Sequence, residues 1–374
     1  MRNPFTPTFG VTPPVLAGRD AEIDAIRRAL RNGPGDPARA MLLTGARGTG
    51  KTVLLNALED VAGQAGWAVL SVTARPGLVD QLTDTLLPQL LNRHDPKTKT
   101  SRITAGSVNV LGVGGGFTRQ VEGAHPVRPD LRRELEDLAT VMADQAGGVF
   151  LSVDEVQRGV ADELREIFQA VQHCFRQGLE VICVAAGLPS GVSDLLNDEV
   201  LTFLRRAERH ALGGLADAAV RSALRQPVVD GGREISSAAL DESAAAVDGY
   251  PFLVQVVGFH LWEDSPARRK IDVTQARRAI GRALADAGRL VYEPLLADLS
   301  ARDVDFLTAM ARIGQDPVPM ADIEAAFAGP NAGQYRRRLI AAEAIEPAGR
   351  GKVRFAVPGL ATFLRSSMSS LENH

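Results

Sequence analysis

Residues 41–52, MLLTGARGTGKT, carry the strongest chemical signal in the sequence. They complete the Walker A pattern G-x-x-x-x-G-K-[ST], which sets phosphate-binding residues at Gly45, Gly50, Lys51 and Thr52. Glycines let the loop curl so that successive N–H groups and the following helix N-terminus point at phosphate oxygens. Lys51, in a binding and a catalytic role, would bridge the β- and γ-phosphates, while Thr52 would offer its hydroxyl to Mg²⁺. The pattern predicts a nucleotide site lined by Gly45, Ala46, Arg47, Gly48, Thr49, Gly50, Lys51, Thr52 and Val53.

A carboxylate pair follows the apolar run in GVFLSVDEVQ, further along the chain. A Walker A loop needs such a group on a neighbouring strand, so Asp154 would hold the Mg²⁺ shell. Glu155 would orient and deprotonate the attacking water. An Asp-Glu pair is also common as an ordinary cap between a strand and a helix. Downstream of a complete Walker A loop, we interpret it as a Walker B motif, and the two motifs predict an ATPase that uses ATP and Mg²⁺.

Strands and helices alternate through the first half of the chain. Continuously apolar runs rich in Val, Ile and Leu predict strands buried on both faces at 40–44, 67–72, 149–153 and 180–186. Amphipathic patterns predict helices at 19–31, 51–63, 78–93, 129–146 and 161–177. This alternation is typical of βαβ units, so we expect an α/β fold with a parallel sheet flanked by helices.

Changes in composition then divide the chain. Residues 94–128 are polar and Gly-rich, and could form either a β-hairpin insertion or a flexible connection. After Gly214, the strand signals fade and helices are predicted at 215–225, 236–247, 250–263 and 274–291. From about Leu299 the pattern is helix, helix, helix and hairpin, the order that a winged helix requires. We expect an α/β domain over 1–213, a helical lid over 214–294 and a winged helix over 295–374.

Composition limits the class of protein. The 374 residues are 45% hydrophobic and 23% charged, values typical of a soluble globular protein. No apolar run approaches the roughly 20 residues that span a bilayer, and MRNPFTPTFG lacks the apolar core of a signal peptide, so we expect a cytoplasmic protein without a membrane partner. Cys174 and Cys183 lie in apolar surroundings that suit reduced core thiols. The six histidines lack the spacing of zinc ligands.

Together these motifs resemble the AAA+ ATPases, and within them the branch that joins origin-recognition-like initiators and archaeal-type ATPases with the STAND signalling ATPases. The segment VLAGRDAEIDAI resembles that family's Gly-Arg-Asp/Glu box, which implies that Gly18 and Arg19 lie near the adenine. The segment LTFLRRAERHALGGL resembles the one carrying an arginine that reaches a neighbouring subunit's nucleotide. The resemblance therefore implies an ATP-dependent homo-oligomer in which Arg206 acts in trans, with Arg205 and Arg209 as the other candidates. The competing interpretation is that these arginines only solvate a helix face.

Two departures from the family pattern predict slow hydrolysis. The strand segment VICVAAGLPS should end in a polar sensor that aligns the water, but that position falls near Ala186 and Gly187, with Ser190 as a substitute. In the lid, the initiator-type sensor arginine would be expected around AAVDGYPFLVQ, where Gly249, Tyr250 and Pro251 stand instead. That turn resembles the STAND motif, in which a proline lies against the nucleotide, so Pro251 is a candidate contact. It is also an ordinary helix start, since Pro suits the first turn. Slow hydrolysis is the behaviour of a switch.

The C-terminal domain concentrates its basic residues on the third helix and the hairpin. In a winged helix these elements face DNA, with the helix in the major groove and the wing along a phosphate backbone. The candidate contacts to double-stranded DNA are Gln334, Arg336, Arg337, Arg338, Arg350, Lys352 and Arg354. The net charge of −3 is compatible with such a local patch. The alternative is a nucleotide-gated protein-interaction module with little hydrolysis and no DNA binding.

Overall fold

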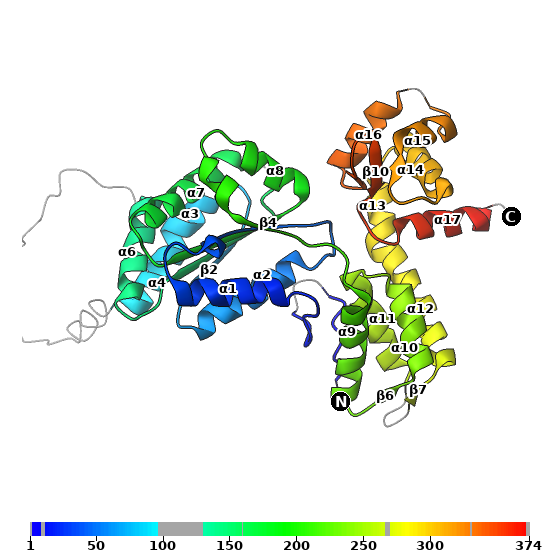
Figure 1. Cartoon of the computed structure of the whole chain (residues 1–374), viewed down its shortest axis with the longest axis horizontal. Coiled ribbons are helices and arrows are strands. Elements are labelled where there is room, and N and C mark those ends of the chain that lie inside the picture. The colour runs from blue at the N-terminus through cyan, green and yellow to red at the C-terminus, as the bar shows by residue number, and fades with distance from the viewer. Residues whose placement is uncertain are drawn as a thin grey trace, which may run out of the picture.

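The computed structural model describes residues 2–8, 12–95, 130–158, 160–265, 270–329 and 331–371. The predicted insertion at 94–128, with its β-hairpin, lies outside these residues except for His94 and Asp95. Figure 1 shows a sheet flanked by helices, a helical body coloured green to yellow beside it, and a body coloured orange to red that ends the chain.

A five-stranded sheet forms the centre of the first body, in the order β2-β3-β4-β1-β5, and every pairing is parallel. The strands are β1 (Ala40–Thr44), β2 (Ala68–Thr73), β3 (Val149–Asp154), β4 (Val181–Gly187) and β5 (Glu208–Ala211). The first four confirm the sequence prediction. The sequence does not predict β5, because its polar residues, ERHA, lack an apolar run and are half-buried or exposed at the sheet edge.

Helices cover both faces of this sheet (Figure 1). On one face lie α1 (Asp20–Asn32) and α2 (Lys51–Gln64). On the other lie α3 (Leu78–Gln81), α4 (Leu87–His94), α6 (Leu131–Ala143) and α7 (Ala161–Arg176), and a π-helical segment, Leu82–Leu86, joins α3 to α4. Because strand side chains alternate, Met41 and Leu43 join the first core while Leu42 joins the second. The predicted α/β class is confirmed.

The helical lid begins after β5. It comprises α9 (Asp217–Asp230), α10 (Ser237–Val247), α11 (Pro251–Glu263) and α12 (Val273–Ala287), as the sequence predicts. A parallel pair, β6 (Glu234–Ile235) and β7 (Lys270–Ile271), closes its far end. The N-terminal segment packs here as well: Phe5 is buried against Gly258, where a Cβ would overlap the Phe5 ring.

The C-terminal body combines helices with a small sheet. Its helices are α13 (Glu293–Ala297), α14 (Ala301–Ile313), α15 (Met320–Ala326), α16 (Ala332–Ala341) and α17 (Leu360–Leu371). The antiparallel strands β8 (Val318–Pro319), β9 (Ile345–Pro347) and β10 (Lys352–Phe355) follow the order β8-β10-β9. The helices and hairpin predicted from the sequence are present, and β8 and α17 are additions. The division of the chain at 213 and 294 stays a prediction.

The hydrophobic core agrees with one further sequence expectation. Cys174 and Cys183 are both buried and free, as expected for core thiols. Within the described ranges, no helix is both long enough and apolar enough to cross a membrane. The largest core cluster runs from the lid into the C-terminal body, including Tyr250, Tyr292 and Phe306.

Candidate nucleotide-binding site

The Walker A loop joins the end of β1 to the start of α2. Gly48 and Gly50 have φ values of 77° and 90°, a region that glycine adopts without steric cost. Lys51 Nζ donates hydrogen bonds of 2.7 Å and 2.9 Å to the carbonyl oxygens of Gly45 and Ala46. Burial lowers the pKa of Lys51, while the carboxylates of Glu155 and neighbouring residues oppose that shift. The loop backbone therefore wraps around a buried lysine at the N-terminus of a helix, as an anion-binding site requires.

Of the two carboxylates expected to act on metal and water, Asp154 ends β3 and Glu155 follows it. Thr52 Oγ1, in the first turn of α2, donates a 2.6 Å hydrogen bond to Asp154 Oδ2. The other carboxylate oxygen, Asp154 Oδ1, accepts a 2.8 Å hydrogen bond from the Glu155 backbone N–H. The arrangement brings a hydroxyl and a carboxylate together at the strand end, and hard oxygen donors of this kind suit Mg²⁺.

Glu155 has left-handed backbone geometry, with φ of 58°. For a non-glycine residue this conformation is uncommon and costs energy, and such residues cluster at functional sites. Its Oε2 accepts hydrogen bonds from Gln157 Nε2 and from Arg158 Nε, the latter at 3.1 Å. The sequence does not single out Gln157 or Arg158, although both follow the Walker B pair directly.

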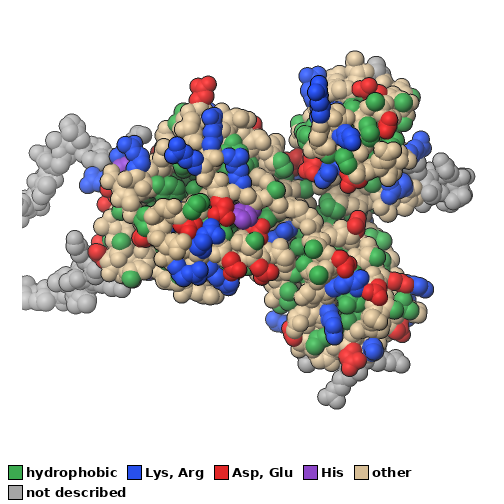
Figure 2. Space-filling model, viewed as in Figure 1, with side chains coloured by type: hydrophobic (Ala, Val, Ile, Leu, Met, Phe, Trp, Pro, Cys, Tyr) green, Lys and Arg blue, Asp and Glu red, His purple; other side chains and the backbone are tan. Residues whose placement is uncertain are grey.

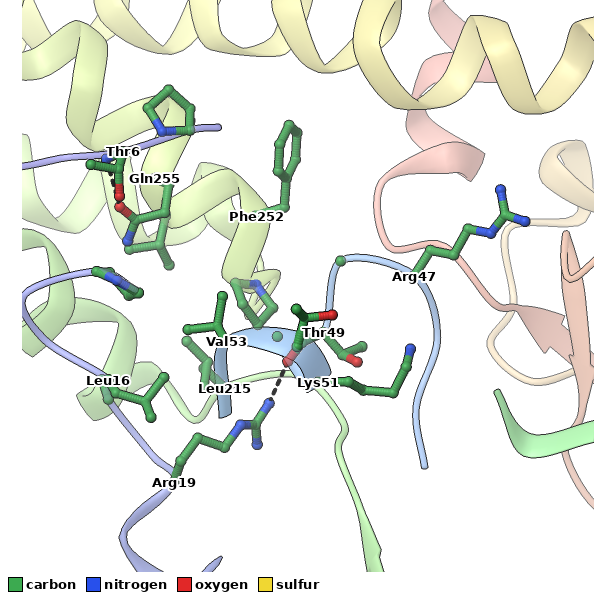
Figure 3. Close-up of a pocket in the computed structure, with 18 of the residues that line it drawn as sticks. Thr6, Leu16, Arg19, Arg47, Thr49, Lys51, Val53, Leu215, Phe252 and Gln255 are labelled. Atoms are coloured by element: carbon green, nitrogen blue, oxygen red, sulfur yellow. Dashed lines mark hydrogen bonds between the residues drawn. The ribbon is translucent and has the colours of Figure 1, made fainter. Parts of the chain in front are cut away.

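Arg19 lies against the Walker A loop. Its Nη2 donates to the carbonyl oxygen of Thr49 at 3.1 Å (Figure 3). It also donates to the carbonyl oxygen of Gly213 at 3.0 Å. Arg19 is buried, and burial lowers its pKa. Gly18 precedes it with φ of 68°. The Gly-Arg box thus fixes the loop backbone to the segment that leads from β5 into the lid.

A cavity of about 620 Å³ opens between the loop, the N-terminal segment and the lid. Its volume falls within the range of small-molecule sites. Beside the loop it is lined by residues including Thr6, Leu16, Glu155, Pro251 and Phe252 (Figure 3). Pro251, the first residue of α11, therefore lines the same cavity as Lys51 and Thr52. The apolar end near Leu16 and Phe252 and the polar end near Lys51 suit a ligand with a flat apolar part and an anionic part.

Arg47, in the middle of the loop, contacts both of the other bodies. Its carbonyl oxygen accepts a 3.2 Å hydrogen bond from Tyr250 Oη in the lid. Its Nε lies 3.3 Å from Glu343 Oε2, directly after α16, and Figure 3 shows the Arg47 side chain directed toward the C-terminal ribbon. Glu343 has φ of 60°, and burial raises the pKa of its carboxyl. No local sequence signal identifies Glu343, because the contact joins residues far apart in the chain.

The remaining candidates lie away from this cavity. Arg206 is exposed at the end of a 3₁₀ helix, Thr202–Arg206. Arg205 Nε donates to the carbonyl oxygen of Leu196 at 3.0 Å, and Arg209 Nη2 donates to that of Arg205 at 2.7 Å. Two of the three arginines are therefore bonded to nearby backbone, and Arg206 lies exposed beside them.

The basic residues of the C-terminal body differ in their surroundings. Exposed side chains are those of Gln334, Arg337, Arg338, Arg350, Lys352 and Arg354, whereas Arg336 is half-buried. Arg338 is paired with the buried carboxylate of Asp303, and Arg354 lies 3.7 Å from Asp316. Figure 2 shows Lys and Arg side chains interspersed with Asp and Glu on this body.

Ser190 is exposed in the first turn of α8 (Pro189–Asn197), which follows β4. Ala186 and Gly187, at the expected sensor position, are both buried in β4. A polar side chain from the segment after β3 reaches the end of β4: Gln157 Oε1 accepts a 3.1 Å hydrogen bond from the Leu188 N–H.

Comparison with known proteins agrees with this geometry. Residues 15–184 match the family described as AAA ATPase domain, and residues 289–364 match a domain of unknown function (DUF8462). The structure resembles the Walker-type ATPase PABY2304 of Pyrococcus abyssi, with a TM-score of 0.61 and 19% identity over 94% of this chain and 96% of that chain. It also resembles the Aeropyrum pernix ORC2 protein in its ADPNP-ADP complexes, with a TM-score of 0.56 and 15% identity over 97% and 98%. No curated protein matches the sequence.

These findings confirm an AAA ATPase domain and an AAA+ fold. They agree with the sequence-based resemblance to archaeal-type and origin-recognition-like ATPases at the level of the fold. They support nucleotide binding by a P-loop ATPase domain in general.

Proposed function

We propose that this protein binds Mg-ATP, hydrolyses it slowly and uses the state of the nucleotide to position its C-terminal domain. The observation that carries the proposal is the double contact of Arg47, with Tyr250 of the lid and Glu343 beyond α16. A residue inside a phosphate-binding loop responds to any change in the phosphates that the loop holds. Arg47 is therefore placed to pass that change to both of the other bodies.

Residues already in the site suit Mg²⁺ and phosphate. Thr52 Oγ1 and Asp154 Oδ2 would hold the ion, which in such sites takes only one or two protein ligands beside phosphate oxygens and water. When bound, the ion neutralises charge on the phosphates. Lys51 would bind the β- and γ-phosphates, and Glu155 would orient and deprotonate the attacking water.

We further propose that the C-terminal domain is a winged helix that binds double-stranded DNA through α16 and the β9–β10 hairpin. Arg337, Arg350 and Lys352 support this proposal, because all three are exposed and sit on the two elements that face DNA in such folds. Phosphate contacts of this kind give affinity without reading sequence.

A second candidate is a nucleotide-gated protein-interaction module. The ion pairs of Arg338 with Asp303 and of Arg354 with Asp316 favour it, because they neutralise part of the basic surface within the domain. In either case Arg206, exposed beside β5, could act on the nucleotide of a neighbouring copy. An absence of ATPase activity with or without DNA, together with an ATP-dependent change of oligomeric state, would favour this second candidate.

The main experiment measures nucleotide binding and domain position in the same full-length protein. Fluorophores on Glu166→Cys in α7 and Glu324→Cys in α15 would report the distance between the sheet and the C-terminal domain, since both side chains are exposed. We expect ATP to change energy transfer in the otherwise wild-type protein and to have no effect in Lys51→Ala, which cannot hold the phosphates. ATP binding without any change in energy transfer would exclude the switch.

A further inference from the structure

The end of β4 is shaped around a side chain that belongs to another segment. A Cβ at Gly187 would lie 3.0 Å from Gln157 Oε1 and 2.5 Å from Val156 Cγ2. A Cβ at Gly191, in α8, would lie 2.5 Å from the Cβ of Gln157 and 2.6 Å from its Cα. Real Cβ atoms essentially never approach so closely, so both glycines give room to the segment that follows β3. The β4–α8 turn therefore fits around Gln157.

The amide of Gln157 is held in one orientation. Its Oε1 accepts the 3.1 Å hydrogen bond from the Leu188 N–H, at the turn that leaves β4. An amide oxygen can accept this bond and an amide nitrogen cannot, so the Nε2 group must face the other way. On that side it donates to Glu155 Oε2. Gln157 thus links the backbone at the end of β4 to the carboxylate beside the Walker B aspartate.

Glu155 receives a second donor of a different kind. Arg158 Nε donates to the same oxygen, Oε2, at 3.1 Å, but its side chain is 64% exposed. An exposed arginine holds a carboxylate weakly, because solvent screens the pair and the long side chain loses entropy in it. The neutral amide of Gln157, half-buried against the β4–α8 turn, gives the more constant direction. With Oε2 held by both donors, Oε1 is the oxygen free to act on water.

We propose that Gln157 is the positioning residue that performs the role of the polar sensor missing from β4. It fixes the Glu155 carboxylate relative to β4 through the Leu188 N–H, and it does so without adding charge. This inference rests on the proposed hydrolysis of ATP and adds to it the means by which the base is aligned. It would account for the proposed turnover in a chain whose β4 ends in Ala186 and Gly187.

The test compares Gln157→Met and Gln157→Glu with the wild type and Glu155→Gln in the full-length protein. Gln157→Met keeps the side-chain length but cannot donate, so we expect kcat to fall at least about tenfold, since alignment of a general base contributes factors of this order or more. The KM and the ATP dissociation constant should stay within about twofold, because no phosphate contact is lost. Arg158→Ala is the matched control, and we expect a smaller loss of kcat.

Gln157→Glu gives a readout that loss of packing cannot imitate. Glutamate has the shape of glutamine and can still accept from the Leu188 N–H, but at pH 8 its carboxylate cannot donate to Glu155. We therefore expect kcat at pH 8 to fall at least as far as in Gln157→Met, with KM again within about twofold of the wild type. This variant decides the question even if Gln157→Met does not fold.

The outcomes separate the two proposals. If wild-type hydrolysis depends on Glu155 while Gln157→Met or Gln157→Glu keeps the wild-type kcat, the inference about Gln157 is wrong and the ATPase assignment stands. If Glu155→Gln hydrolyses ATP as fast as the wild type, the roles of Glu155 and Gln157 both fail but the ATPase assignment stands. If the wild type hydrolyses no ATP, the ATPase proposal fails and this inference fails with it.

Discussion

The Thr52 hydroxyl lies 2.6 Å from Asp154 Oδ2 and joins the first turn of α2 to the last residue of β3. The two residues are separated by a long stretch of sequence, and they meet because β3 lies next to β4 and β4 next to β1 in the sheet. Parallel strands bring their carboxyl ends to one edge, where ligands bind in open α/β sheets. The pair defines the point at which a metal ion would touch the protein.

Removing the Asp154 carboxylate should abolish metal-dependent turnover. In Asp154→Ala we expect no hydrolysis at any Mg²⁺ concentration, because the remaining Thr52 hydroxyl holds the ion too weakly. Thr52→Ser is the matched control, since it keeps the hydroxyl and should retain most of the activity. Phosphate release measured across a Mg²⁺ titration checks this, and Mg²⁺-dependent turnover in Asp154→Ala would contradict the assignment.

Glu155→Gln should separate binding from hydrolysis. The amide cannot take a proton from water, so we expect turnover to fall by a factor of roughly 10² to 10⁴. ATP affinity should change little, because Glu155 is not expected to touch the phosphates. Calorimetry and a single-turnover assay on the same preparation measure both quantities. Unchanged turnover would mean that another group activates the water.

Removing the Arg47 guanidinium should weaken the docking of the C-terminal domain on the loop, because it leaves the half-buried Glu343 carboxylate without its partner. Arg47 is 66% exposed, so the ion pair should be worth roughly 0.2–1 kcal/mol, a shift of up to about fivefold in the docked population. Energy transfer between the two labelled positions measures that population in Arg47→Ala. The control is Arg27→Ala, which removes an exposed arginine from α1. Equal effects of the two substitutions would argue against a specific contact.

Glu343, the partner of Arg47, predicts a pH dependence. Burial raises the pKa of Glu343 in the docked arrangement, while Arg47 and Lys51 oppose the shift and Glu155 adds to it. The docked state therefore binds this proton more tightly than an undocked state. Docking should be favoured below the normal glutamate range and should weaken as the pH rises through the raised pKa. In Glu343→Gln the slope of energy transfer against pH should decrease; an unchanged slope would assign it to other groups.

DNA binding, if it uses α16 and the hairpin, should depend on salt and on exposed basic residues. The double substitution Arg337→Ala with Lys352→Ala removes two phosphate contacts, so the slope of log affinity against log salt should decrease by about 1.8. The control pair is Arg27→Ala with Arg31→Ala, an equal charge change on α1. Fluorescence anisotropy at several salt concentrations gives the slopes, and equal losses in both pairs would place the DNA elsewhere.

The cysteines should be unreactive in the folded protein. Burial raises the pKa of Cys174 and of Cys183 to about 12, so neither forms the reactive thiolate at pH 8. We expect a thiol reagent to label neither residue in native protein and both after unfolding. Because the folded state holds these protons more tightly, their contribution to stability is complete below the unfolded thiol pKa and is lost as the pH rises toward 12. Rapid labelling at pH 8 under native conditions would contradict the buried positions.

The sequence predicts those parts of the site that depend on local pattern. The Walker A motif and the apolar strands that end at Thr44 and Asp154 are each defined by a few consecutive residues. The phosphate loop, the metal position and the sheet can therefore be inferred from the sequence. Edge strand β5 could not be predicted in this way, because polar residues at a sheet edge carry no apolar signal.

Sequence patterns do not predict contacts between distant segments of the chain. The family pattern predicts a polar sensor at the end of β4, but Ala186 and Gly187 stand there. The amide that reaches the end of β4 belongs to Gln157, which follows β3. The pairing of Arg47 with Glu343 depends on how the C-terminal domain packs, and no spacing rule relates the two residues. The packing of Phe5 on the lid is of the same kind, since its partner, Gly258, lies far from it in the sequence.

The double contact of Arg47 has a thermodynamic consequence that works in both directions. If ATP alters how firmly Glu343 is held, then any molecule that draws the C-terminal domain away from Arg47 must alter ATP affinity by the factor by which ATP alters the affinity for that molecule. A ligand of that domain would therefore act as an effector of the nucleotide site without touching it. Measuring ATP affinity at increasing concentrations of candidate ligands would turn this reciprocity into a way of finding the domain's partner.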